Sequence, residues 1–196
     1  SQQELEEVLS GVRQSAFDVR RLQSVVMVQC VGSRDKDRPY CSRICCAEAV
    51  KNAIALKELN PDIDVYVLYR DIRTYGLREE YFRKARELGV VFIRYTPESP
   101  PVVSIPSPSK GEGQGEGERP VVTVTDPILG QTLELTPDLL VLSSGIVPQT
   151  GSAELAQMLK VPLNAEGFFL EAHMKLRPVD FATEGVFMAG LCHFPK

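Results

Sequence analysis

Three apolar, strand-like runs alternate with two helical segments between residues 24 and 95. The runs are SVVMVQCV, VYVLY and VVFIRY, and their nearly continuous apolar character is typical of strands buried on both faces. The helical segments span 41–59 and 77–88, and each repeats apolar residues every three or four positions. This order predicts an α/β fold of Rossmann-like type, in which crossover helices join the strands of a parallel sheet.

The helical segments carry two more detailed expectations. If the first helix opens at Cys41, then Cys41 and Cys45 are four residues apart and share one face of it. In the second helix the buried face is predicted to consist of Leu77, Tyr81, Ala85 and Leu88.

The pattern changes after residue 96. The segment 106–119 is rich in Pro, Gly, Ser and Glu and is expected to be a flexible loop. VVTVTD and QTLELT flank PILG and predict a β-hairpin, and LLVLSSG predicts one more buried strand. We therefore expect a connector or polar helix at 1–21, a Rossmann-like module at 22–146, and a separate segment at 147–196.

Charge and hydropathy exclude several classes of protein. The formal net charge is −4 and the pI is about 5.3, so nucleic acid is not an expected partner. No apolar run approaches the roughly 18 residues of a membrane-spanning helix, so direct membrane insertion is not expected either. The first residues, SQQELEEVLS, do not resemble a signal peptide. A cytoplasmic location is expected.

Four of the five cysteines fall within 17 positions. Cys30 ends the first predicted strand, and Cys41, Cys45 and Cys46 open the first predicted helix. In a parallel α/β sheet this edge is where ligands bind, and a helix N-terminus stabilises thiolates. The sequence therefore predicts that the four thiols converge there.

Four converging thiolates suit zinc or an iron–sulfur cluster. The spacing C-x10-C-x3-C-C differs from the paired short knuckles of structural zinc sites, which favours a 4Fe–4S cluster. A structural metal module, in which zinc or a cluster only holds the loop 31–40, remains an alternative. So does a set of small buried residues at a helix–sheet contact.

A nicotinamide-binding βαβ unit would carry G-x-G-x-x-G after its first strand. Here that place reads QCVGSRD, and Gly32 is its single glycine. An NAD(P)H-dependent disulfide reductase is accordingly the weakest of the alternatives.

The motifs VQCVGSRD, PYCSRICC, DIRTYG, LLVLSSGIVPQTG and GVFMAGLCHFPK resemble the A-type subunit of heterodisulfide reductase. The resemblance covers about 22–196 and includes the A-type subunits of quinone-interacting oxidoreductases. It implies an oxidoreductase with a thioredoxin-reductase-like core that binds FAD and iron–sulfur clusters. Such a protein passes electrons between the flavin and partner subunits.

Matched position by position, the resemblance implies that Cys30, Cys41, Cys45 and Cys46 hold a 4Fe–4S cluster. It places Ser144, Gly145, Pro148, Gly190 and His193 near FAD. The segment 147–196 would then be part of a flavin domain, following a nucleotide-domain-like module. No glycine-rich flavin-binding turn occurs in these 196 residues. We therefore expect a fragment of a longer protein, with an incomplete FAD site and no activity by itself.

Overall fold

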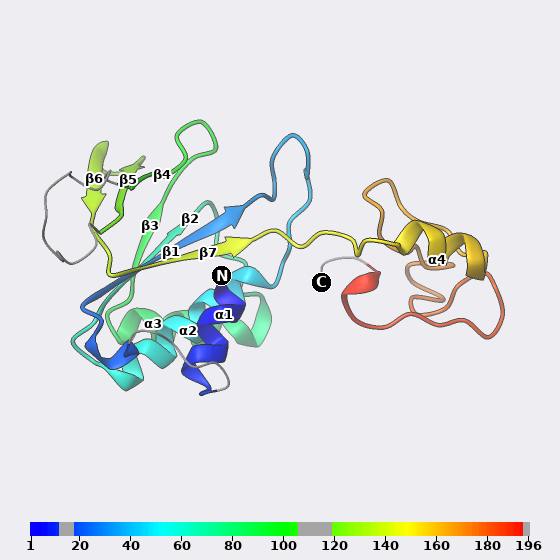
Figure 1. Cartoon of the computed structure of the whole chain (residues 1–196), viewed down its shortest axis with the longest axis horizontal. Coiled ribbons are helices and arrows are strands. Elements are labelled where there is room, and N and C mark those ends of the chain that lie inside the picture. Colours follow the sequence, from blue (N-terminus) through cyan, green and yellow to red (C-terminus); the bar gives the residue numbers. More distant parts are fainter. Residues whose placement is uncertain (12–17, 106–118, 194–196) are drawn as a thin grey trace, which may run out of the picture. The chain divides into compact units, whose positions relative to one another are not determined.

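The structure is a computed structural model that describes residues 1–11, 18–105 and 119–193 (Figure 1). The chain divides into two compact units. The first unit contains residues 1–31 and 45–144, and the second contains 32–44 and 145–196. Each unit is described by itself below.

A four-stranded parallel sheet forms the centre of the first unit. Its strands are β1 (Ser24–Val31), β2 (Asp64–Tyr69), β3 (Val91–Arg94) and β7 (Leu139–Ser144), in the order β3-β2-β1-β7. The central position of β1 places Met27 between Val67 of β2 and Val141 of β7. The predicted parallel sheet is confirmed, because all three pairings are parallel.

Three helices cover one face of this sheet: α1 (Gln2–Leu9), α2 (Cys45–Leu59) and α3 (Glu79–Glu87) (Figure 1). Short 3-10 helices at Val19–Arg21 and Gly76–Arg78 precede β1 and α3. The core on this face joins Val25 and Met27 of β1 to Ala49, Val50 and Ala53 of α2. None of the helices in the described ranges combines the length and the apolar content that a membrane span requires.

An antiparallel sheet packs against the other face. It consists of β4 (Val102–Ser104), β5 (Val121–Asp126) and β6 (Gln131–Leu135). Val122 and Val124 of β5 share a core with Val26 and Val28 of β1. The predicted hairpin is confirmed as β5 and β6, whereas β4 was not expected. Of the predicted loop 106–119, only Arg119 lies within the described residues.

Two expectations about the helices are wrong. The helix α2 begins at Cys45 rather than Cys41, so Cys41 and Cys45 do not share a helix face. The segment before α2 is bent instead, because Arg43 has a φ of 62° and its N–H donates to Cys41 Sγ at 3.2 Å. This local side-chain bond competes with the first helical turn.

The buried face of α3 also differs from the prediction. Leu77 and Tyr81 are exposed, whereas Phe82 and Leu88 pack with the buried Ala85 in the helix-side core. Leu77 lies in the 3-10 helix that precedes α3, so it does not follow the α-helical spacing on which the predicted face was based. The sequence analysis placed Tyr81 on the buried face, whereas its neighbour Phe82 takes that position in the structure.

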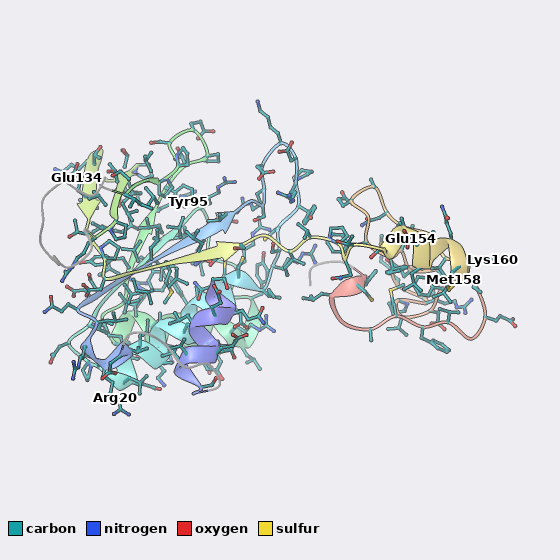
Figure 2. The ribbon with its side chains drawn as sticks, viewed as in Figure 1. Arg20, Tyr95, Glu134, Glu154, Met158 and Lys160 are labelled. Atoms are coloured by element: carbon teal, nitrogen blue, oxygen red, sulfur yellow. The ribbon has the colours of Figure 1, made fainter. Side chains whose placement is uncertain are left out.

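The second unit has little regular structure. It contains α4 (Ser152–Leu159), a 3-10 helix at Gly190–Cys192 and a core of five buried residues. Two side chains of the 32–44 loop hold the chain after residue 145: Tyr40 donates to the carbonyl of Ile146 at 2.9 Å, and Ser42 Oγ accepts the N–H of Ile146 at 2.9 Å. The labelled Met158 lies on α4 (Figure 2).

Candidate functional site

Three cysteines of the first unit lie buried near the end of β1 and at the start of α2. Cys30 is buried near the carboxyl end of β1, and Cys45 and Cys46 are the buried first residues of α2. A crossover helix starts at the edge of the sheet where the preceding strand ends, so the three thiols belong to the same edge. None of the five cysteines forms a disulfide.

Cys30 has an unusual backbone conformation. Its φ is 62°, in the left-handed region, which costs a non-glycine residue about 1–2 kcal/mol. The pairing of β1 with β7 is irregular between Val28 and Val31, around this residue. Because side chains alternate along a regular strand, this conformation interrupts the alternation at Cys30. Backbone strain of this kind is concentrated at functional sites in proteins.

Cys46 is the thiol with the most specific surroundings. Its Sγ lies 3.8 Å from the carbonyl oxygen of Asp71, in the DIRTYG loop after β2. A hydrogen bond from the Cys45 thiol, together with one from the backbone of Arg73, lowers the pKa of Cys46 to about 7, although burial acts in the opposite direction. A substantial part of Cys46 is therefore thiolate near neutral pH, the form that binds metals.

The donor set in the first unit fits a thiolate-ligated metal centre in its chemistry, since it offers three buried sulfurs. In the described part of the chain, however, no three Cys, His, Asp or Glu side chains are close enough together to hold a metal ion. The fourth predicted ligand, Cys41, is half-buried and belongs to the second unit.

The residues predicted to approach FAD have diverse surroundings. Ser144 is the exposed last residue of β7 in the first unit. Gly145 follows it and belongs to the second unit, as do Pro148, the exposed Gly190 and His193.

The backbone of Gly145 is covered by the chain itself. A Cβ atom at this position would lie 2.3 Å from the carbonyl oxygen of Gly32 and 3.2 Å from Cβ of Ser33. The glycine is therefore required by a close contact between two backbone segments. That contact explains Gly145 without a flavin.

A pocket of about 440 Å³ lies within the second unit. One wall is the segment Ile146–Ser152 with Leu155, and the other consists of Gly167, Phe168, Phe169, Leu191 and Cys192. Pro148 is therefore part of the pocket, and Gly190 is adjacent to it in sequence. The pocket is mostly apolar, which suits one face of an aromatic ring system.

His193 does have a specific partner, which sequence analysis missed. Its Nε2 forms a short hydrogen bond with a carboxylate oxygen of Glu171, and both side chains are largely buried. The two residues are 22 positions apart, and no local pattern in the sequence connects them. Glu171 fixes the orientation of the imidazole ring in the second unit.

No protein-family model matches the chain. Curated relatives do: the chain is 42% identical over 180 residues to the A-type iron-sulfur subunit of CoB–CoM heterodisulfide reductase from Methanocaldococcus jannaschii. It is 37% identical over 182 residues to a protein of Archaeoglobus profundus named as similar to the A-type subunit of heterodisulfide reductase. The matches cover 88% and 92% of this chain. This stretch of chain is homologous to the A-type subunits of heterodisulfide reductase. It spans about a quarter of the length of these relatives.

Among solved structures, the chain resembles thioredoxin reductase of Lactococcus lactis with a TM-score of 0.51 and 17% identity. The likeness covers 95% of this chain and 52% of that one. It confirms the predicted α/β fold of thioredoxin-reductase type, and at this identity it concerns the fold alone.

Proposed function

We propose that this stretch of chain is part of an electron-transfer protein of the heterodisulfide reductase type, and that Cys30, Cys41, Cys45 and Cys46 ligate a 4Fe–4S cluster. The observation that supports the proposal is that Cys30, Cys45 and Cys46 are all buried where β1 ends and α2 begins. The curated relatives include one named as an iron-sulfur subunit, which supports it.

The residues of this chain would bind the cluster and shield it from water. A bound cluster would supply one-electron transfer. Cys45 and the backbone of Arg73 stabilise the thiolate form of Cys46, so this ligand is already prepared for metal near pH 7. Burial of Cys30, Cys45 and Cys46 excludes water from the sulfurs, and solvent exposure is one of the factors that set a cluster's potential.

The pocket of the second unit is our candidate for one part of an FAD site. Pro148, Phe168 and Leu191 offer apolar contacts for a ring system, and His193, held by Glu171, offers a polar group close in sequence to Leu191. Gly190 is proposed to border this part of the site, and Ser144 stays a proposed FAD contact of the first unit, whereas the surroundings of Gly145 argue for a packing role. Other subunits of a heterodisulfide-reductase-like or quinone-interacting complex are the proposed partners. A cytoplasmic location would suit five cysteines without a disulfide.

The decisive experiment is anaerobic purification of the chain, followed by metal analysis and spectroscopy. The proposal expects about four irons per chain and a broad absorption band at about 400 nm that dithionite bleaches. A matched pair of cysteine variants tests which thiols bind the iron. Cys46→Ser should lose most of the iron, whereas Cys192→Ser should keep it, because Cys192 is exposed in the second unit and is not a proposed ligand.

Three results would contradict the proposal. One zinc per chain and no colour would indicate a structural metal module. If the chain is incubated anaerobically with iron and sulfide but retains neither, it does not bind a cluster. Equal iron in both variants would show that the cluster, if present, uses other ligands.

A further inference from the structure

Gln29 is a buried polar side chain that the fold leaves without a partner. It precedes Cys30 on β1 and is 1% exposed. Neither its amide nitrogen nor its amide oxygen has a hydrogen-bond partner among the described residues. Buried amides in native proteins are nearly always satisfied, and an orphaned one calls for an explanation such as a missing ligand.

The other buried polar side chains on the helix-covered face show how unusual this is. Asn52 of α2 donates to the carbonyl of Gln2 at 3.1 Å and to its side-chain oxygen at 2.9 Å. Gln2 in turn donates to Ser143 Oγ of β7 at 3.2 Å. These three residues satisfy one another, so the face does not lack polar partners in general. Gln29 stands outside this network.

The alternation of β1 up to Val28 predicts that the Gln29 side chain lies on the face that α2 covers. Val25 and Met27 lie in the core with α2, whereas Val26 and Val28 lie in the core on the opposite face. Gln29 is the next residue of the first series, and it lies with Cys30 in the stretch between Val28 and Val31 where the pairing with β7 shifts. Its backbone is fixed, since its carbonyl accepts a hydrogen bond at 2.6 Å from Tyr95, labelled in Figure 2.

The direction of α2 brings its first turn to the same level. In a crossover unit the helix runs antiparallel to the strand, so residues farther along β1 meet residues earlier in α2. The end of β1, with Gln29 and Cys30, therefore belongs to the same edge of the sheet as the first turn of α2, with Cys45 and Cys46.

We propose that the Gln29 carboxamide donates a hydrogen bond to a sulfur of the cysteine-bound cluster and thereby raises its reduction potential. The proposal rests on the proposed function, because it needs a cluster at Cys30, Cys45 and Cys46. The physical reason is that reduction adds negative charge to the cluster, and an N–H donor stabilises the more negative state. Gln29 is a positioning and tuning residue in this account and transfers no proton.

The test compares the full chain with Gln29→Leu after anaerobic reconstitution, using iron content and an EPR-monitored redox titration. We expect unchanged iron and about a tenfold lower ratio of reduced to oxidised cluster at a fixed ambient potential, which for one electron corresponds to about 59 mV. Asn52→Leu is the matched control: it removes a buried amide of the same helix-covered face that is already satisfied within the chain, so it should lower stability and leave the potential unchanged.

A second readout does not depend on the cluster. In the cofactor-free chain Gln29→Leu should raise the melting temperature, because it replaces an orphaned amide by an apolar side chain of similar size. A lower melting temperature would show that the amide has ordinary partners in the fold and would overturn the inference.

The outcomes separate the two proposals. Equal potentials in the wild-type and Gln29→Leu chains, both loaded with iron, would overturn the role of Gln29 and leave the cluster standing. Absence of iron from the wild-type chain would overturn the proposed function, and this inference with it. Loss of iron from a folded Gln29→Leu chain, while Asn52→Leu retains it, would show that Gln29 is needed to hold the cluster and would overturn its assignment as a tuning residue.

Discussion

The two units of this chain bury their apolar side chains to very different extents. In the first unit the central sheet has a core on each face, and β1 is buried almost throughout. In the second unit the buried core has five residues, while Met158, Met174, Leu176 and Phe187 are each at least two-thirds exposed. The first unit also exposes Leu77, Ile105 and Ile128, so the difference lies in the size of the cores: one on each face of the central sheet in the first unit, and a single small one in the second.

The largest expected effect comes from truncating the same residue type in each unit. Met27→Ala, at a fully buried position of β1, should lower the free energy of unfolding by about 2–5 kcal/mol, because it removes core contacts and leaves a cavity. Met158→Ala, on the exposed side of α4, should change it by less than about 0.5 kcal/mol. Denaturant titrations of both variants measure the two changes in the free energy of unfolding. Equal losses would contradict the difference between the units.

The buried thiol pair of the first unit should make the cofactor-free chain depend on pH. The folded-state pKa of Cys46 is about 7, against an ordinary 9.0. The Cys46 thiolate therefore stabilises the folded chain fully above pH 9, and this stabilisation is lost as the pH falls through 7. Two pKa units correspond to a loss on the order of 2–3 kcal/mol. The measurement is the free energy of unfolding of the wild type and of Cys46→Ala, across that range under reducing conditions.

This prediction concerns the change of the free energy of unfolding with pH, rather than its absolute value. Cys46→Ala should lose the dependence, and Cys45→Ala should weaken it, since the Cys45 thiol is the main donor to Cys46. Identical pH profiles for the wild type and Cys46→Ala would show that Cys46 ionises at its ordinary pKa.

Gly145→Ala should disturb the second unit selectively. Its Cβ would collide with the carbonyl oxygen of Gly32, which forces two backbone segments apart and costs about 1–3 kcal/mol. We expect faster hydrogen exchange across 145–193 and unchanged protection in β1 and β2. Ser144→Ala is the control, because that side chain is exposed. Equally fast exchange in both units would mean that they unfold together.

The smallest effect concerns the attachment of α1 to the first unit. Lys51 of α2 contacts Glu6 of α1 at 2.8 Å and Glu48 at 2.6 Å, and both pairs are near the surface. Lys51→Met should therefore cost about 0.2–1 kcal/mol, less at high salt. A loss that does not change with salt would indicate that packing of the lysine stem, not charge, joins the helices.

Local pattern was enough to predict most elements of the first unit. The apolar runs became β1, β2, β3 and β7, and the turn signal PILG correctly separated β5 from β6. The errors occurred where a local bond or a neighbouring residue decided the outcome. The Arg43 turn delayed the start of α2, and Phe82 rather than Tyr81 took the buried position on α3. The short edge strand β4 has three exposed residues and therefore no alternation that a sequence could reveal.

The sequence by itself determined the order of strands and helices and the clustering of cysteines at one strand–helix junction. Periodicity and spacing are properties of neighbouring residues, so they can be read without a structure. Only the tertiary structure decided that Cys30 is left-handed, that Gly145 meets Gly32 and that Glu171 holds His193. It alone also showed that the buried Gln29 side chain has no hydrogen-bond partner among the described residues. Each of these depends on which distant segments pack together, because burial and hydrogen-bond partners are set by contacts that the local sequence does not encode.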